Sequence, residues 1–353
     1  MCGAAFVNNY KFPNLGMPAS VVHILNKKQH NEYIKYVDME RKISFDDVQK
    51  AVVDAYEEVK SLKEGEIDPR VADISKAGTF GVSLVLTDGR SVHKGDMDTV
   101  FPLGPIVKVP VSVVLLSQNT PQELVKKACD CGASCGCHKG KEHKAKMLLP
   151  FGKHGLRAVS AIQPLGDPES KFSLVTNMIT AMSGAPATLN DSMYKYYQQQ
   201  TAADKVVDQL SVEGAYRIYD DPAQTVDEYS RLLSLQMSTR QLATMGATIA
   251  ADGRNPYSGQ YAFDGTIAAP VVALMATRGK HFIKPWMVLT GLPAKKTFAG
   301  GILAVLPGFG ALAAYSPEVC GKGVSVKASR FMELVAQKLG LSVYSSARVE
   351  VEK

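Results

Sequence analysis

Long hydrophobic runs are missing from this sequence of 353 residues. A membrane-spanning helix needs roughly 18–20 consecutive apolar residues, and the most apolar stretch, Gly300–Pro317, is interrupted by Pro307, Gly308 and Gly310. The N-terminus also lacks the basic start and apolar core of a secretory signal peptide. We therefore expect no spanning helix, no membrane partner and a cytoplasmic location.

A strong charge of either sign is missing as well. The chain has 40 basic and 34 acidic residues, a formal net charge of +6, and this small excess predicts no nucleic-acid partner. With 46% hydrophobic and 21% charged residues, the composition excludes a disordered chain, a collagen and a coiled coil. The length fits one large domain or two medium ones.

Four of the six cysteines lie within nine positions, as Cys129, Cys131, Cys135 and Cys137. Two Cys-x-Cys pairs place thiolates close enough to hold zinc or another soft metal. The C-x2-C spacing of zinc ribbons is absent from this segment. A second interpretation therefore remains, in which the segment is a surface insertion whose thiols bind metal only opportunistically. The surrounding residues 120–155 are rich in Cys, Lys and His, and we expect them to form an insertion.

Hydrophobic periodicity predicts an α+β fold, with strands near both ends of the chain and helices between them. Ser44–Lys63 has apolar residues at helical spacing after an acidic first turn. Phe80–Leu86 and Ser91–Gly95 flank an Asp-Gly turn and predict a hairpin. The remaining expected elements are helices at Lys108–Leu116, Thr225–Ala251, Ala268–Thr277 and Ser325–Leu339, and strands at Trp286–Leu289, Gly301–Leu306 and Ala311–Tyr315.

The sequence G-L-P-A-K-K-T-F-A-G-G-I, Gly291–Ile302, resembles the G-L-P-A-K-S-G-V-G-G-G-I motif of the glutaminase family. Blocks at Phe80–Arg90, Arg240–Ala250 and Asn255–Gly259 fit the family in the expected order. The resemblance implies a β-lactamase-like fold, hydrolysis of L-glutamine to L-glutamate and ammonia, a homo-oligomer and no cofactor. It divides the chain into an N-terminal helical extension at 1–65 and a glutaminase-like domain at 66–350, with the insertion at 120–155 inside it.

The resemblance breaks down at the family's nucleophile. In the family motif F-x-I-Q-S-I-S-K, a serine is activated by the lysine three residues later. The corresponding stretch here is F-P-L-G-P-I-V-K, so the lysine is present as Lys108 and the serine position is Pro105. Proline has no hydroxyl to attack an amide and no N–H to stabilise an oxyanion.

Other site positions implied by the resemblance differ too. Tyr229 and Lys295 are retained, whereas Lys296 and Thr297 replace the Ser and Gly of the K-S-G motif. Lys205 and Lys296 are cationic where the family is neutral, which indicates a pocket adapted to an anion unless both are solvated surface residues. The substrate-binding positions implied by the alignment are Gly104, Thr180, Gln198, Lys205, His281 and Phe298.

We therefore expect a catalytically impaired glutaminase homologue that binds an amino-acid-like small molecule or a partner. Two alternatives remain at this point. One is an active amidohydrolase with an altered mechanism, in which water attacks and Lys108 or His281 is the base. The other is a metal-binding or thiol-responsive module that works through Cys129–Cys137.

Overall fold

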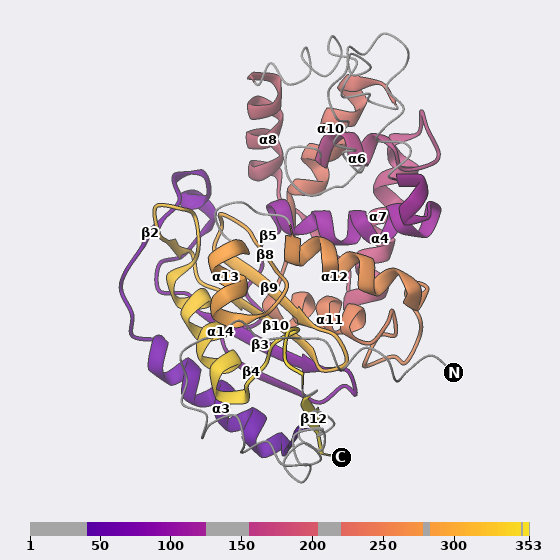
Figure 1. The fold of residues 1–353 in the computed structure, drawn as a ribbon. Coiled ribbons are helices and arrows are strands. Elements are labelled where there is room, and N and C mark those ends of the chain that lie inside the picture. Colours follow the sequence, from indigo (N-terminus) through magenta and orange to yellow (C-terminus); the bar gives the residue numbers. More distant parts are fainter. Residues whose placement is uncertain (1–40, 125–154, 204–219, 278–282, 347–348, 353) are drawn as a thin grey trace, which may run out of the picture.

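The computed structural model describes residues 41–124, 155–203, 220–277, 283–346 and 349–352. Within these ranges no helix is long and apolar enough to cross a membrane. The centre is a five-stranded antiparallel sheet in the order β4-β3-β10-β9-β8 (Figure 1). Its strands are β3 (Gly81–Leu86), β4 (Ser91–Gly95), β8 (Ala294–Lys296), β9 (Gly301–Leu306) and β10 (Gly310–Tyr315). Both ends of the chain contribute strands, which confirms the predicted sheet.

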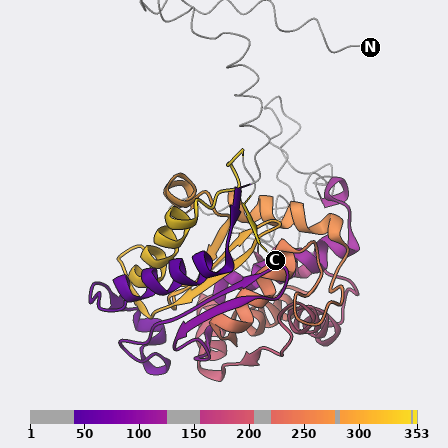
Figure 2. The same ribbon diagram turned by 90° about the horizontal axis from the view of Figure 1, so that it is seen from below.

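Side chains alternate between the two faces of this sheet, and both faces are buried. On β3, Leu84 belongs to one hydrophobic cluster and Val85 to the other. The first face is covered by helices α3 (Phe45–Val59) and α14 (Val326–Leu339), and the second by α11 (Thr239–Ala250) (Figure 2). Because both faces of the three central strands are buried, β9 and β10 carry only apolar side chains and β3 has a single polar one, Ser83, whose hydroxyl hydrogen-bonds to that of Thr239 on α11.

Helix α3 is part of this core. Ser44 and Asp47 form a capping box at its start, and its apolar face, including Val48 and Val52, packs in the same cluster as Phe331 of α14. The predicted boundary between an N-terminal extension at 1–65 and a domain at 66–350 therefore divides elements that share one core. Residues 1–40 lie outside the described part of the chain.

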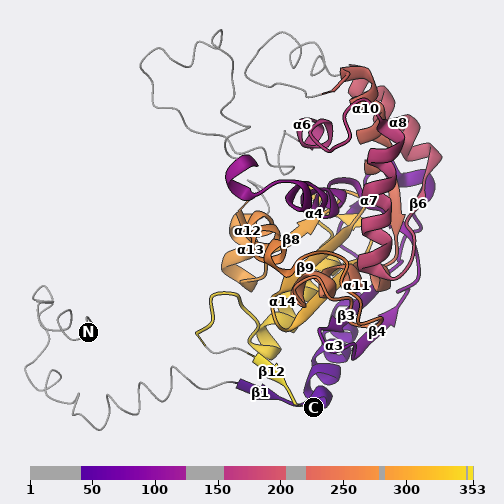
Figure 3. The ribbon, with the colours of Figure 1, turned by 90° about the vertical axis from the view of Figure 1, so that its right-hand side faces the viewer.

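A second layer of helices lies beside the sheet (Figure 3). Its helices are α4 (Lys108–Gln118), α6 (Gly155–Ser160), α7 (Pro168–Ser183), α8 (Asp191–Ala203), α10 (Pro222–Leu233) and α12 (Ala268–Thr277). The short strands form three small sheets. One contains β5 (Phe101–Pro102), β7 (Leu235–Met237) and β6 (Thr188–Leu189). In the other two, β2 (Glu66–Ile67) pairs with β11 (Glu318–Val319) and β1 (Arg41–Ile43) pairs with β12 (Val349–Val351). Short 3-10 helices are η1 (Pro69–Ile74), η2 (Gly104–Val107) and η4 (Gly265–Ile267).

Two predicted elements are wrong. The expected strand Trp286–Leu289 lies in helix α13 (Ile283–Thr290), where Trp286 is buried and Val288 is 87% exposed; a short apolar run fits either structure. The expected helix Thr225–Ala251 is interrupted by β7, after which Ser238 and Gln241 form a new capping box for α11. Residues 125–154, most of the predicted insertion, lie outside the described residues.

Candidate active site

The turn that bears Pro105 and Lys108 joins the central sheet to the helical layer. Strand β5 pairs with β7, and the Leu103 N–H donates to the Leu235 carbonyl at 2.7 Å. Gly104 then adopts φ +47°, a left-handed conformation that suits glycine. Pro105 follows in η2, and Lys108 begins helix α4 directly afterwards. Pro105 and Lys108 are both half-buried and stand one helical turn apart.

Lys108 meets Tyr229 of helix α10 on the inner side of this turn. The Lys108 Nζ lies 5.8 Å from the centre of the Tyr229 ring. Gly155, at the start of α6, packs against both side chains: a Cβ there would lie 2.3 Å from the Tyr229 hydroxyl and 2.9 Å from Lys108 Cε. The three residues come from three helices, so the close packing depends on the absence of a side chain at position 155.

Strand β8 and the turn after it form the opposite wall. Lys295 is buried on β8, and Thr297 follows the strand. A Cβ at Gly104 would lie 2.9 Å from Thr297 Oγ1 and 3.1 Å from the hydroxyl of Tyr197 on α8. Burial raises the pKa of Tyr197, so its hydroxyl stays neutral. Two neutral hydroxyl groups therefore pack against the turn immediately before Pro105.

Phe298 extends this wall toward the exterior. Its ring lies under the Arg70 guanidinium, 3.8 Å from the guanidinium carbon to the ring centre, and its centre is 6.2 Å from that of Tyr197. Arg70 in turn binds Asp68 through two hydrogen bonds of 2.7 and 2.5 Å. These bonds hold the pKa of Asp68 below its ordinary value, so the pair stays ionised.

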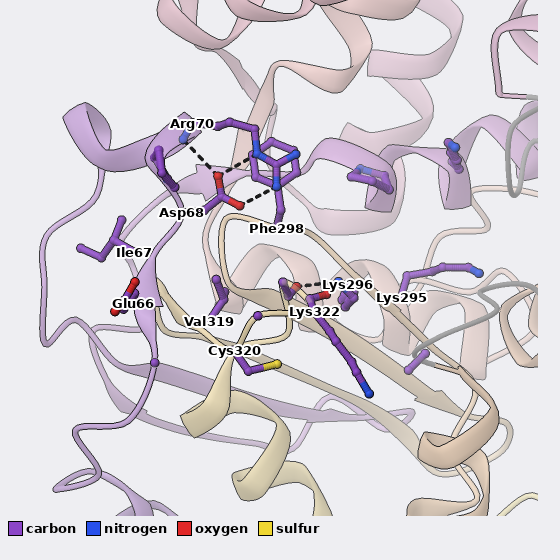
Figure 4. Close-up of a pocket in the computed structure, with 17 residues that line it drawn as sticks. Glu66, Ile67, Asp68, Arg70, Lys295, Lys296, Phe298, Val319, Cys320 and Lys322 are labelled. Atoms are coloured by element: carbon purple, nitrogen blue, oxygen red, sulfur yellow. Dashed lines mark hydrogen bonds and ion pairs between the residues drawn. The ribbon is translucent and has the colours of Figure 1, made fainter.

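A cleft of about 1020 Å³ lies between these walls (Figure 4). Pro105 and Lys108 line it together with β8, the β2–η1 segment and the loop after β11. In the described part of the chain, its basic side chains are Arg70, Lys108, Lys295, Lys296 and Lys322, and its acidic ones are Glu66 and Asp68. The cleft is of the size that binds small molecules.

The comparisons with known proteins agree with this geometry. A family model described as Glutaminase matches residues 67–344. The chain belongs to the glutaminase family. It is 31% identical to a glutaminase of Bacteroides thetaiotaomicron over 317 residues, which cover 87% of this chain and 98% of that one. It is also 31% identical to a glutaminase of Brucella canis over 271 residues, 76% of this chain and 85% of that one.

Solved structures show the same fold. The probable glutaminase ybaS superposes with a TM-score of 0.75 at 26% identity, covering 86% of this chain and all of that one. The Bacillus subtilis glutaminase YbgJ, in covalent complex with 5-oxo-L-norleucine, gives a TM-score of 0.68 at 19% identity. The match covers 85% of this chain and 98% of that one. The predicted β-lactamase-like glutaminase fold is therefore confirmed.

The structure brings together some of the site residues implied by the resemblance. Pro105, Lys108 and Phe298 line the cleft, Gly104 adjoins Pro105, and Tyr229 contacts Lys108. The roles that the glutaminase resemblance implies for them remain predictions.

Thr180 and Gln198 do not line the cleft. The Thr180 hydroxyl donates to the Thr176 carbonyl within helix α7, at 2.9 Å. Gln198 is exposed on α8, and its amide donates to Tyr194 and to Asp227. The residue of α8 that lies near Gly104 is the adjacent Tyr197, and the substrate-binding roles that the resemblance implies for Thr180 and Gln198 stay predictions. Lys205, His281, Cys129, Cys131, Cys135 and Cys137 lie outside the described residues.

Sequence reasoning missed Gly155, Tyr197, Arg70 and Cys320. Gly155 was assigned to the edge of the insertion, and Tyr197 is one residue from the predicted Gln198. Arg70 and Cys320 reach the cleft because β2 pairs with β11, a contact of two-residue strands without a periodic pattern. Within the described residues, no group of three or more His, Cys, Asp or Glu side chains is arranged to hold a metal ion.

Lys296 and Cys320 interact across the outer cleft. The Lys296 ammonium donates to the carbonyls of Lys322 at 3.2 Å and Gly323 at 2.5 Å. Burial lowers the pKa of Lys296, and nearby Arg70 acts in the same direction. Partial burial opposes ionisation of the exposed Cys320 thiol, but the N–H groups of Lys322 and Val324 together with Lys296 lower its pKa overall. The field at this end of the cleft therefore favours negative charge.

Proposed function

We propose that this glutaminase-family protein does not hydrolyse glutamine through an acyl-enzyme and instead binds a small molecule in the cleft. The observation that supports this is Pro105, which lines the cleft one turn before Lys108. Its side chain offers no oxygen or sulfur to attack a carboxamide, so the nucleophile that the family motif places there is missing. The homo-oligomer implied by the resemblance is part of the same proposal.

The backbone at position 105 adds a second defect. A proline has no N–H, so this residue cannot donate to the oxyanion of a tetrahedral intermediate. Loss of one such donor typically lowers kcat by about 100- to 1000-fold. Phe298, at the position that would supply the other donor, has its ring packed between Arg70 and Tyr197. The nucleophile and one oxyanion donor are therefore lost in a single substitution.

An ammonia-release assay on L-glutamine tests the proposal. We expect no ammonia above the enzyme-free blank from the natural protein, with the Bacteroides thetaiotaomicron relative as the positive control. Pro105→Ser restores a hydroxyl and an N–H at the same place. We expect this variant to remain inactive, because Lys296, Thr297 and Phe298 still replace the residues that follow the retained lysine in the family motif. Ammonia release by the natural protein at an ordinary enzymic rate of about 1–1000 per second would refute the proposal.

A covalent probe gives an independent answer. The Bacillus subtilis glutaminase YbgJ forms a covalent complex with 5-oxo-L-norleucine on reaction with 6-diazo-5-oxo-L-norleucine. We expect this chain to form no such adduct on the peptide that contains Pro105, measured by peptide mass spectrometry beside that relative. Cysteine peptides are scored separately, because thiols react with the reagent on their own. An adduct between residues 101 and 118 contradicts the proposal.

The retained contact between Lys108 and Tyr229 favours one alternative, an amidohydrolase in which water attacks and Lys108 is the base. The matched test compares Lys108→Ala with Lys50→Ala, a change of an exposed lysine on helix α3. If any amidase activity is present and only Lys108→Ala abolishes it at unchanged unfolding temperature, the alternative holds. Equal activity in both variants eliminates it.

A further inference from the structure

The charge of the cleft is unbalanced. Among the residues that the structure describes, five basic side chains line it against two acidic ones, and one of those acids, Asp68, is bound by Arg70. Lysines enter from three elements. Lys108 comes from α4, and Figure 4 shows Lys295 and Lys296 of β8 and Lys322 of the loop after β11. A concave site lined by one sign of charge raises the local concentration of the opposite ion.

Two of these lysines are held in place by the fold. Lys295 is 8% exposed on β8, where its neighbours pair with β9. The Lys296 ammonium donates to two carbonyls of the 322–323 loop. Since an ammonium has three N–H donors, the two carbonyls leave a further donor for a ligand. A bound anion would also offset the desolvation that lowers the pKa of Lys296.

The same walls disfavour a ligand with an ammonium group. Behind the lining residue Pro105, the side chains that pack against Gly104 are Tyr197 and Thr297, and these neutral hydroxyls supply no carboxylate. A zwitterion such as glutamine brings one positive charge for each negative one. In the described part of the cleft, that positive charge meets Lys108 and Lys295, whereas only the exposed Glu66 offers a carboxylate outside the Arg70 pair.

We propose that the cleft binds a small doubly negative anion without an ammonium group, either a dicarboxylate or a phosphate, in preference to glutamine. The inference rests on the proposed function, because an active glutaminase needs the cleft to accept the zwitterion. The volume of about 1020 Å³ leaves room for an organic body attached to the anionic group. The recognition chemistry is shared by the two ligand types: both accept hydrogen bonds from the lysine ammonium groups that β8 and the 322–323 loop contribute to the cleft.

Isothermal titration calorimetry at low salt tests the preference with three probes: glutarate, inorganic phosphate and L-glutamine. We expect at least one of the two anions to bind about tenfold or more tightly than glutamine. The anion that binds identifies the carboxylate or the phosphate class. Glutamine binding as tight as both anions, or no anion binding at millimolar concentration, overturns the inference. Neither result bears on ammonia release, which tests the proposed function separately.

Charge reversal locates the site. Lys322→Glu changes an exposed loop residue and leaves the core intact, and Lys50→Glu is the matched change on α3, outside the cleft. We expect Lys322→Glu to weaken anion binding about tenfold and Lys50→Glu to change it less than about twofold, at low ionic strength where screening is small. Equal effects of the two variants overturn the assignment. Unfolding temperatures recorded on the same samples show that both variants are folded.

Cys320 supplies a readout that needs no ligand. It is an exposed free thiol that lines the cleft. Alkylation at its peptide is measured by mass spectrometry with anionic iodoacetate and with neutral iodoacetamide. The ratio of the two rates cancels changes in thiol pKa, which affect both reagents alike. We expect Lys322→Glu to lower the iodoacetate-to-iodoacetamide ratio several-fold and Lys50→Glu to leave it unchanged. An unchanged ratio in Lys322→Glu overturns the inference.

Discussion

The ammonium of Lys108 and the ring of Tyr229 lie 5.8 Å apart, nitrogen to ring centre. Lys108 begins α4 and Tyr229 lies in α10, so their contact ties the turn of Pro105 to the helical layer. The backbone of Gly155 completes this contact from α6. The pair is retained although a proline occupies the position of the family's nucleophile, and this fits a structural role for Lys108.

This contact makes a prediction for Gly155. Alanine is the better helix former by about 1 kcal/mol, yet we expect Gly155→Ala to destabilise the protein by about 1–3 kcal/mol, the usual range for overpacking. The new Cβ would lie 2.3 Å from the Tyr229 hydroxyl. Adding Tyr229→Phe removes that hydroxyl and should recover part of the loss. Denaturant unfolding of the single and double variants measures the coupling.

Gly321→Ala is the control, because a Cβ there meets nothing within 4 Å. We expect its stability to stay within about 0.5 kcal/mol of the natural protein. If Gly155→Ala is equally neutral, α6 does not pack against Lys108 and Tyr229 as described.

Much of the fold could be predicted because its elements have strong local signals. The Asp88-Gly89 turn fixes the β3–β4 hairpin, and Ser44 with Asp46 and Asp47 marks the start of α3. Ser91–Gly95 and Gly301–Leu306 match the observed strands. Trp286–Leu289 failed because four apolar residues suit a helix or a strand equally, and only packing of Trp286 against the sheet decides between them.

The candidate site was predictable only where a motif fixes the register. Lys108 and Phe298 belong to continuous motifs, and both line the cleft. Gln198 comes from a less certain stretch of the alignment and is exposed on α8, whereas the adjacent Tyr197 packs near Gly104, because one residue on a helix turns the side chain by about 100°. Arg70 enters the site because β2 pairs with β11. These two strands are about 250 positions apart in the chain, and each is too short to leave a periodic pattern in the sequence.

The stacking of Arg70 on Phe298 predicts an energetic coupling. The guanidinium carbon is 3.8 Å from the ring centre, and such contacts contribute about 0.5–1 kcal/mol at exposed sites. A double-mutant cycle of Arg70→Ala and Phe298→Ala should show a coupling of this size. Arg240, which pairs with Asp98, is the control: Arg240→Ala combined with Phe298→Ala should be additive within about 0.5 kcal/mol. Additivity of the Arg70 pair would exclude the stack in solution.

The cysteine cluster makes a prediction for metal content. If Cys129, Cys131, Cys135 and Cys137 form a specific site, four thiolates hold about one zinc or other soft metal per chain. Elemental analysis of freshly purified, reduced protein measures this ratio, and the variant with all four changed to Ser should lose the metal. A ratio near zero in the natural protein removes the metal-binding alternative.

Glu228 predicts how stability changes with pH. Its side chain is 2% exposed on α10, and burial raises its pKa to about 8. An ordinary Glu in the unfolded chain has a pKa of about 4.3, so between these two values the folded state holds a proton that unfolding releases. The contribution of Glu228 to the free energy of unfolding therefore falls as pH rises from about 5 to about 8.

The variant Glu228→Gln keeps the shape and cannot ionise. We expect it to be more stable than the natural protein at about pH 8, by an amount of order 2–4 kcal/mol, and nearly equal to it at about pH 5. Glu58→Gln, at a half-exposed position on α3, is the control, and it should change the free energy of unfolding by the same amount at both pH values. Urea unfolding at the two pH values checks this. A stability difference for Glu228→Gln that does not grow with pH means that this carboxyl is ionised in the fold, with a cation close enough to offset its burial.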